Sequence, residues 1–372
     1  MTGARGAVLV VFLFLLVGCR VKPEVKVEDS GERTSSSIET ADTSVSTSET
    51  AADSGNTEDS VLKDTESTTG SDTQDTGEEC SGEGIGLVVI AEGEGCGGGA
   101  VDSGLGGESS EQYIDVSVGF SHACGVLMSS GGVRCWGRDT SGSVSDVPEG
   151  EFVSVASGGY HSCAVRRDGD ILCWGYDAYL QARAPQGPVF NQVVAGEYHS
   201  CAIDSEGRLY CWGIEGGSWD GGQVTDTPGG RYVSVFAGAY HNCALTVCGE
   251  ARCWGKNDDG EATLPAGEFA SFALMIGSSC ALRVDGQVEC WGLKFNDFIE
   301  PPSCGLVGIG SGSYHSCGLN DIGELSCWGS HSEEDAVPPG VFVKVDGGSD
   351  NTCALREDGV VVCWGRVLGN PP

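Results

Sequence analysis

The residues of this chain most able to do chemistry are its nineteen cysteines, fourteen of which recur in seven pairs. Nine residues separate the two cysteines in six pairs, and ten separate them in the first. Such pairs can form disulfides or contribute ligands to zinc, but the Cys-x2-Cys step common in zinc sites is absent. The spacing therefore favours disulfides. The predicted pairs are Cys124 with Cys135, Cys163 with Cys173, Cys201 with Cys211, Cys243 with Cys253, Cys280 with Cys290, Cys317 with Cys327 and Cys353 with Cys363.

Histidines ahead of the first cysteines are the second group with chemical potential. They could form a ring of metal ligands or serve the same structural purpose in every copy. A residue that recurs at one position of a repeat usually packs and hydrogen-bonds alike each time, so we interpret them as structural and predict no metal and no cofactor. Ser278 and Asn351 replace the histidine in the fifth and seventh copies. The histidines are His122, His161, His199, His241 and His315.

The segment between paired cysteines predicts a β-hairpin. In the second copy, apolar runs flank Arg167-Asp168-Gly169, and Asp-Gly between such runs is a turn signal. A three-residue loop closed by Gly169 in the left-handed region places Cys163 opposite Cys173. We expect a non-hydrogen-bonded pair there, within reach of a disulfide. The extra residue of the first copy requires an even loop, for which residues 129–132 supply turn formers.

The whole unit returns every 36 to 42 residues, and each second cysteine begins a Cys-Trp-Gly triplet. An apolar run such as residues 152–156 precedes each hairpin, and a polar loop follows it. Short strands at such a period predict a four-stranded antiparallel blade per repeat. Seven blades around an axis form a β-propeller. The fold class is therefore all-β: a seven-bladed β-propeller over residues 113–372 with one disulfide inside each blade.

The motif Gly-x-x-His-Ser-Cys-Ala-Val, then Asp-Gly and Cys-Trp-Gly, resembles the regulator of chromosome condensation repeat. Residues 256–261, Lys-Asn-Asp-Asp-Gly-Glu, are similar to the end of that repeat. The resemblance covers about residues 113–366 and implies a seven-bladed propeller. It is greatest to the secreted bacterial branch, which includes an inhibitor of beta-lactamase. The cysteine pairs depart from that family and indicate an oxidising compartment.

The N-terminus predicts export and lipid attachment. Arg5 precedes an apolar run too short to span a membrane comfortably, and residues 16–19, Leu-Val-Gly-Cys, resemble the bacterial lipobox. We expect residues 1–18 to be a lipoprotein signal peptide and Cys19 to be acylated. Several acyl chains at one site give stable anchoring. Arg20 after the cysteine favours the outer membrane of a bacterial cell envelope. The alternatives are an ordinary signal peptide or an anchor helix.

Residues 19–79 predict a disordered tether, because 22 of the 48 residues from 30 to 77 are Ser or Thr and aromatics are absent. Residues 80–112 are Gly-rich. Their β-branched run, 85–90, could add a strand to the last blade and so close the ring, or form a small separate hairpin. We expect the remaining cysteines to pair as Cys80 with Cys96 and Cys248 with Cys304.

The charge of the chain excludes one class of partner. Residues 113–372 contain 14 basic and 32 acidic residues, a net charge of −18. Binding to nucleic acid requires the opposite sign, so we expect no nucleic-acid partner.

The loops after Cys-Trp-Gly vary while the blades repeat, and they carry the aromatic candidates for partner binding. Aromatics on variable loops above a rigid scaffold suggest a contact surface. Trp219 is the leading candidate, since it is the one tryptophan outside the triplets. It could instead only hold its Gly-rich loop in place. The candidates are Tyr176, Tyr179, Trp219, Phe295 and Phe298.

These features predict an envelope lipoprotein whose propeller binds a protein or glycan. An inhibitor of an extracellular enzyme is the second hypothesis, by resemblance to the beta-lactamase inhibitor. A propeller-based lyase or hydrolase is the third. Catalytic motifs such as Gly-x-Ser-x-Gly or His-Glu-x-x-His are absent from the sequence, so we do not expect an enzyme.

Overall fold

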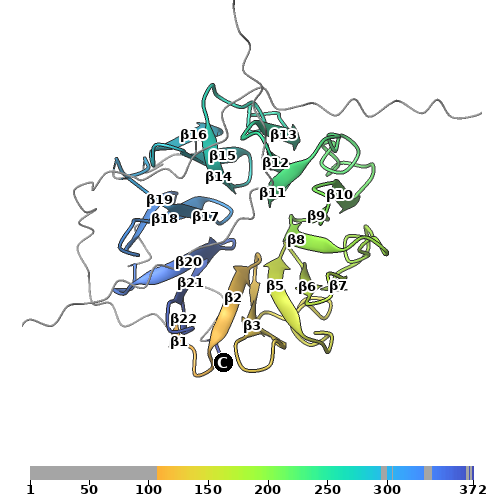
Figure 1. The fold of residues 1–372 in the computed structure, drawn as a ribbon, viewed down its shortest axis with the longest axis vertical. Coiled ribbons are helices and arrows are strands. Elements are labelled where there is room, and N and C mark those ends of the chain that lie inside the picture. The colour runs from red at the N-terminus through yellow and green to blue at the C-terminus, as the bar shows by residue number, and fades with distance from the viewer. Residues whose placement is uncertain (1–106, 295–299, 304, 331–336, 366–367, 369–370) are drawn as a thin grey trace, which may run out of the picture. The chain divides into compact units, whose positions relative to one another are not determined.

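Seven small antiparallel sheets follow one another around a central axis in the computed structural model (Figure 1). It describes residues 107–294, 300–303, 305–330, 337–365, 368 and 371–372. The predicted signal peptide, Cys19, the tether, Cys80, Cys96 and residues 85–90 lie outside these ranges, so those assignments stay predictions. The described residues include no helix long and apolar enough to cross a membrane.

Each repeat contributes an inner, a middle and an outer strand. The inner strands, nearest the axis, are β2 (Tyr113–Val118), β5 (Phe152–Ser157), β8 (Phe190–Ala195), β11 (Tyr232–Ala237), β14 (Phe269–Leu274), β17 (Gly308–Ser311) and β20 (Phe342–Gly347). The middle strands are β3 (His122–Leu127), β6 (His161–Arg166), β9 (His199–Asp204), β12 (His241–Thr246), β15 (Ser278–Arg283), β18 (His315–Leu319) and β21 (Asn351–Arg356). The outer strands are β4 (Val133–Gly137), β7 (Ile171–Gly175), β10 (Leu209–Gly213), β13 (Ala251–Gly255), β16 (Val288–Gly292), β19 (Leu325–Gly329) and β22 (Val361–Gly365).

The hairpin register agrees with the sequence prediction. Cys163 lies opposite Cys173, and the amide of Arg166 donates to the carbonyl of Asp170 at 2.8 Å across the three-residue loop. Gly169 closes that loop with a φ of 91°. In the first copy the amide of Leu127 donates to the carbonyl of Gly132, which leaves the four-residue loop 128–131.

All seven predicted disulfides within blades are confirmed. In each, the first cysteine lies on the middle strand and the second on the outer strand, with their Cα atoms 4.0 to 4.1 Å apart. The disulfides join Cys124 to Cys135, Cys163 to Cys173, Cys201 to Cys211, Cys243 to Cys253, Cys280 to Cys290, Cys317 to Cys327 and Cys353 to Cys363. These fourteen cysteines are therefore engaged in disulfides and are not zinc ligands.

In the first four repeats the sheets have three strands, so the prediction of four strands is wrong there: after Cys-Trp-Gly the chain forms turns instead. In the fifth and sixth repeats part of the segment after the triplet, residues 295–299 and 331–336, lies outside the described ranges. In the first repeat Asp139 Oδ1 accepts the amides of Val144 and Ser145, and Ser141 adopts a φ of 55°. These local bonds satisfy backbone groups that a strand would pair with a neighbour.

The seventh sheet does have a fourth strand, β1 (Gly107–Glu108), which pairs with β22. Gly107 lies opposite Cys363 and Glu108 opposite Val362. β1 belongs to the Gly-rich segment 80–112, but the run predicted for this role, 85–90, lies outside the described residues.

The first and last repeats also meet on the axis side of the same seam. Lys344 Nζ of β20 contacts Asp115 Oδ1 of β2 at 2.5 Å, and Ser117 Oγ donates to Asp346 at 2.9 Å. Two sets of contacts therefore join the N-terminal and C-terminal parts of the ring: β1 pairs with β22 at the outer edge, and β2 contacts β20 near the axis.

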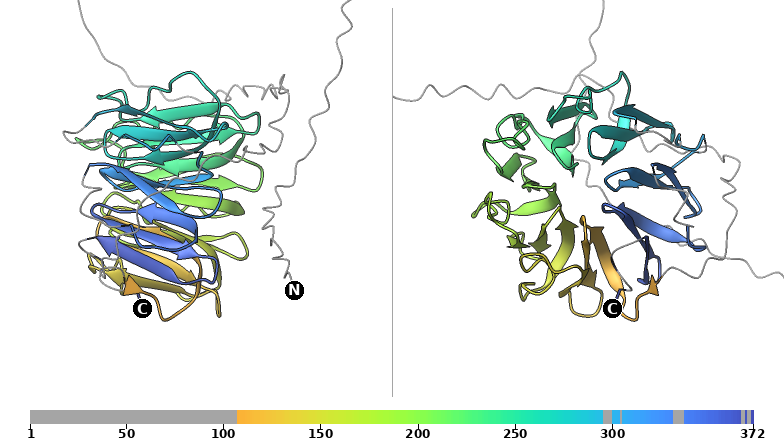
Figure 2. Two further views of the ribbon diagram at one scale, coloured as in Figure 1. Left: turned by 90° about the vertical axis from the view of Figure 1, so that its left-hand side faces the viewer. Right: turned by 180° about the vertical axis from the view of Figure 1, so that it is seen from behind.

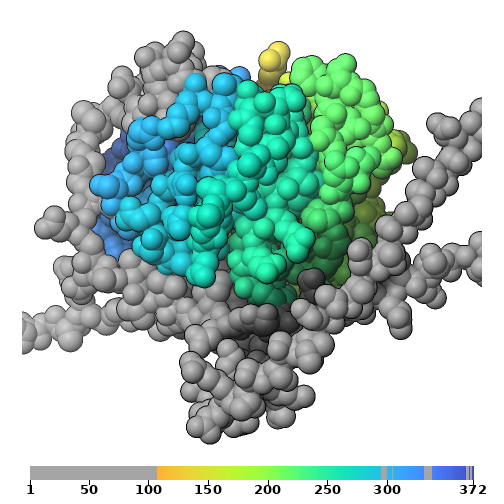
Figure 3. Space-filling model, turned by 90° about the horizontal axis from the view of Figure 1, so that it is seen from above, coloured from red at the N-terminus to blue at the C-terminus, as the bar shows by residue number. Residues whose placement is uncertain are grey.

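Successive blades pack as adjoining slabs, as the rim view of the later repeats shows (Figure 3). The middle strand β6 is buried except at its last residue, because neighbouring blades cover both of its faces. Between the second and third blades, Ile171, Phe190 and Trp212 share one apolar cluster. Because each cluster joins neighbouring repeats, a single blade could not bury its own apolar surface.

The two faces of the ring differ in what the blades present there. Seen edge-on, the strands cross the thickness of the ring from one face to the other (Figure 2). We call the end with the turns between middle and outer strands, such as residues 167–169, the hairpin face. The opposite end, with the segment before each repeat histidine and the start of each loop after Cys-Trp-Gly, is the loop face.

Candidate binding surface

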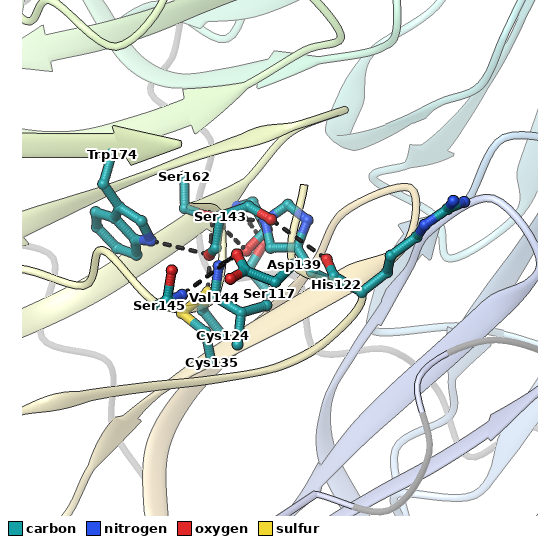
Figure 4. Close-up of a disulfide and its surroundings, with 12 residues drawn as sticks. Ser117, His122, Cys124, Cys135, Asp139, Ser143, Val144, Ser145, Ser162 and Trp174 are labelled. Carbon is teal, nitrogen blue, oxygen red and sulfur yellow. Dashed lines mark hydrogen bonds between the residues drawn. A yellow bond between two sulfur atoms is a disulfide. The ribbon is translucent and has the colours of Figure 1, made fainter. Parts of the chain in front are cut away.

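The repeat histidines join neighbouring blades. His122 Nε2 lies 2.8 Å from Ser162 Oγ, beside the disulfide of Cys124 and Cys135 (Figure 4). His161 bonds Ser200, His241 bonds Ser279 and His315 bonds Thr352, at 2.7 to 2.8 Å. His199 Nε2 bonds Asn242 Oδ1 at 2.7 Å. Each partner directly follows the histidine position of the next repeat. We call each of these bonds an inter-blade clasp.

The clasp extends to the tryptophan of the Cys-Trp-Gly triplet. Ser200 Oγ donates to the carbonyl of Gln181, and Trp212 Nε1 donates to the same oxygen at 2.9 Å. Asn242 Nδ2 and Trp254 Nε1 share the carbonyl of Gln223 in the same way. Because Asn242 donates through Nδ2, its Oδ1 is the acceptor and His199 must carry its proton on Nε2. This geometry supports the interpretation that the repeat histidines have a structural role.

Burial sets the charge state of these rings. Desolvation lowers the pKa of His122 and His199 to about 4 and that of His161 and His241 to about 3. The Nδ1 atoms of all four are buried without a hydrogen-bond partner. The described residues contain no group of three His, Cys, Asp or Glu side chains able to hold a metal ion.

A continuous run of aromatic rings lies on the loop face of the first four blades. We call it the aromatic arc; its members are Phe120, Tyr160, Tyr176, Tyr179, Tyr198, Trp219 and Tyr240. Tyr179 lies 5.1 Å from Tyr198, and Trp219 stacks on Tyr240 at 5.7 Å with an interplanar angle of 16°. Trp219 is 51 % exposed. Lys256 Nζ lies 5.8 Å from the Tyr240 ring centre.

The aromatic arc includes two tyrosines that contact one buried carboxylate, that of Glu197. Glu197 is buried, and its carboxylate interacts with the phenols of Tyr198 and Tyr240. Burial first, and then this carboxylate, raises the pKa of both phenols far above the ordinary range, so both stay protonated. This carboxylate therefore lies between a phenol of the third blade and a phenol of the fourth.

Three of the five predicted partner-binding residues, Tyr176, Tyr179 and Trp219, therefore lie on one surface. Phe295 and Phe298 lie outside the described residues.

Sequence reasoning left Tyr160, Tyr198, Tyr240 and Glu197 out of the candidate set. The sequence does contain a pattern that indicates the three tyrosines, since tyrosine directly precedes the histidine in four repeats. Away from this surface, Cys248 is disulfide-bonded, but its predicted partner Cys304 is not described.

Comparison with solved structures supports the propeller. The CRINKLY WD40 ectodomain of the Arabidopsis thaliana receptor kinase ACR4 is 25% identical, with a TM-score of 0.58 over 72% of this chain and 97% of that one. The entire ectodomain of the Physcomitrella patens receptor kinase CR4 is 24% identical, with a TM-score of 0.57 over 70% and 74%. Yeast RCC1 (Prp20), solved bound to Kap60, is 17% identical, with a TM-score of 0.51 over 68% and 80%.

No curated protein sequence matches this chain closely enough to be called a relative. The family model for the regulator of chromosome condensation (RCC1) repeat does match, at residues 113–143, 152–181, 190–216, 232–261, 307–333 and 342–366. It skips the fifth repeat, the one in which Ser278 replaces the histidine. Six matched copies, arranged as blades of a propeller, show that the chain belongs to the family of proteins built from RCC1 repeats.

Proposed function

We propose that this protein is a binding module of a bacterial cell envelope, held to the membrane through Cys19, whose loop face takes a protein partner. The aromatic arc carries the proposal. Partly exposed aromatic side chains on a rigid base are typical anchors of protein interfaces, since little conformational entropy is lost when they are covered. Trp219 is held between Tyr198 and Tyr240, so its orientation is set before a partner arrives.

Three further observations support binding in an exported setting. Seven disulfides suit an oxidising compartment. The similar propeller of ACR4 is the ectodomain of a receptor kinase. The repeat histidines, the side chains most suited to acid–base catalysis, are engaged between blades, which favours binding over catalysis. The lipid anchor and the outer membrane rest on the sequence around residues 16–20 alone.

Affinity capture with the soluble fragment 80–372, which contains every described residue, tests this proposal. We expect a protein partner that the wild-type fragment retains and that Trp219→Ala binds at least about tenfold more weakly, because a central anchor is lost. Leu293→Ala is the matched control, since Leu293 is a partly exposed apolar residue of the loop face outside the arc.

The nature of the captured molecule separates the remaining hypotheses. An exported enzyme whose activity falls on binding would make the protein an inhibitor, and a glycan lost with Trp219→Ala would replace the protein partner. A partner that binds Trp219→Ala and the wild type equally would show that the arc is not the binding surface.

A further inference from the structure

The hairpin face carries a ring of exposed aliphatic side chains around the axis. Each ring residue is the second residue at the start of an inner strand, or its equivalent ahead of β17. Their exposed fractions run from 42 to 54 %. The ring residues are Ile114, Val153, Val233, Val307 and Val343.

A recurrent irregularity of the inner strands produces this exposure. The pairing of β2 with β3 skips from Tyr113 to Asp115, and the same shift occurs in β5, β8, β11, β14 and β20. A bulge leaves the extra residue unpaired and redirects its side chain. Tyr113 thus stays in the core while Ile114 turns to the surface. The repeat exposes the same position in every blade, and it is a large aliphatic residue in five of them, with Asn191 in the third blade and Ala270 in the fifth.

A second set of exposed aliphatics surrounds the ring at and beside the hairpin turns: Met128, Val189, Val247, Ile322 and Val341. Ten of the thirteen large apolar residues exposed in the described part of the chain therefore lie on the hairpin face. The other three, Leu180, Trp219 and Leu293, lie on the loop face. Single exposed aliphatics are ordinary on protein surfaces, but this concentration on one face is not.

Arginines on the hairpin face pair with carboxylates, in most cases of the same blade. Arg208 contacts Asp204 at 2.7 Å, Arg283 contacts Glu289 at 2.7 Å, and Arg356 contacts Asp358 at 3.1 Å. Comparable pairs join Arg134 to Glu111 and Arg167 to Glu151. The chain as a whole has a net charge of −34, so two copies repel each other in most orientations. Pairing weakens that repulsion where hairpin faces meet.

We propose that the hairpin face is a self-association surface that joins two copies of this chain face to face. A fully exposed aliphatic side chain offers roughly 100 Å² of apolar area, so ten half-exposed ones offer about 500 Å². A standard interface buries about 800 Å² per partner, of which roughly 60% is apolar. The apolar area of the hairpin face therefore matches what one side of a stable dimer presents.

A second copy also fits the symmetry of the surface. A two-fold axis in the plane of the ring brings the same patch of both copies together, so each aliphatic ring faces the other. Arginine–carboxylate pairs recur in several blades, so each copy can place positive groups against negative ones. The loop face stays free on both outer sides of such a dimer.

Sedimentation of residues 20–372, the mature chain without the acylated cysteine, tests this inference. In a concentration series up to tens of micromolar we expect the mass of two chains. Replacing Val153→Asp and Val233→Asp together places charges inside the apolar ring and should weaken association at least about tenfold. Leu180→Asp adds one charge on the loop face and should leave the dimer intact.

The thermal unfolding of each variant shows whether the fold survives. If the aspartate variants fail to fold, Val153→Thr and Val233→Thr keep the β-branched shape and should still weaken association measurably. A wild-type chain that is monomeric throughout the series overturns the inference. So does a dimer that folded ring variants form as tightly as the wild type. Sedimentation of a monomer with lipid vesicles would assign the ring to a membrane and would equally overturn it.

Discussion

Acid should destabilise this propeller through its buried histidines, and one clasp can isolate the effect. We choose His199→Gln, because a glutamine amide can still donate to Asn242 Oδ1 but does not titrate. Burial lowers the pKa of His199 from 6.5 to about 4. A group whose pKa is lower in the folded state supports full stability above its unfolded pKa. That stability is lost as the pH falls from about 6.5 toward 4.

The expected magnitude follows from the two pKa values. At pH 5 the unfolded chain has taken up the His199 proton while the folded chain has mostly not, which costs about 2 kcal/mol of unfolding free energy relative to pH 8. His122, His161 and His241 have similarly lowered pKa values. Acid should therefore destabilise the wild type through all four buried rings, in the same direction.

Reversible urea unfolding with intact disulfides, followed by tryptophan fluorescence from pH 8 to pH 5, measures this. We expect His199→Gln to lose about 2 kcal/mol less than the wild type over that interval. Burial raises the pKa of Asp346, which acts in the opposite direction, but it does so equally in both proteins and cancels in the difference. The reasoning fails if the variant and the wild type show the same pH dependence.

Three further predictions concern the anchor, the disulfides and the seam. Cys19→Ala should release the protein from membranes or leave it uncleaved, and a processed mutant that still partitions into detergent would contradict acylation. Replacing Cys201 and Cys211 with serine should lower the unfolding free energy by about 2–3 kcal/mol, the entropy of a closed loop of about ten residues. Mass spectrometry of the unreduced wild type should find that pair linked, and a free thiol there would refute it. Deleting residues 80–110 should expose the edge of β22, lower the melting temperature and promote association. Deleting only 80–96 tests residues 85–90, and an unchanged melting temperature would show that they do not close the ring.

The features that sequence predicts well here are the local and repeated ones. The spacing of Cys163 and Cys173 and the position of Gly169 determine the hairpin register, because the turn admits few alternatives. The same spacing occurs in the other repeats, with one extra residue in the first, so the prediction of the register rests on seven copies. The fourth strand was mispredicted because turn formers such as Ser141 and Gly142 follow Cys-Trp-Gly, and side-chain bonds from Asp139 satisfy the local backbone.

Contacts between repeats are harder to predict, since they join residues about 40 positions apart. The partner of His161 is Ser200, and nothing in the sequence around either residue indicates the pairing. The aromatic arc has the same character. In the sequence Tyr179 and Trp219 stand out as unusual loop residues, whereas Tyr198 and Tyr240, which they contact, occupy ordinary repeat positions.

The fifth repeat shows how such a contact is lost without loss of the fold. Three residues before the histidine most repeats have glycine, and at Gly158 an added Cβ would lie 2.8 Å from the His161 ring. The fifth repeat has Met275 there, and Ser278 in place of histidine. Met275 is 1 % exposed and packs in a cluster with Leu306 and Trp328.

The two substitutions therefore act as one change, in which a thioether side chain fills the volume that the imidazole occupies elsewhere. Packing is retained, but the polar clasp is not. Ser278 Oγ and Ser316 Oγ, which stand where the two ends of that clasp would be, are both buried without a hydrogen-bond partner. Each such hydroxyl costs about 1–3 kcal/mol. The seam between the fifth and sixth blades thus lacks the histidine clasp. Two other hydrogen bonds still cross it, from Ser311 Oγ to the carbonyl of Leu274 and from the amide of Ile276 to the carbonyl of Ser313. It is the seam at which the ring should open first.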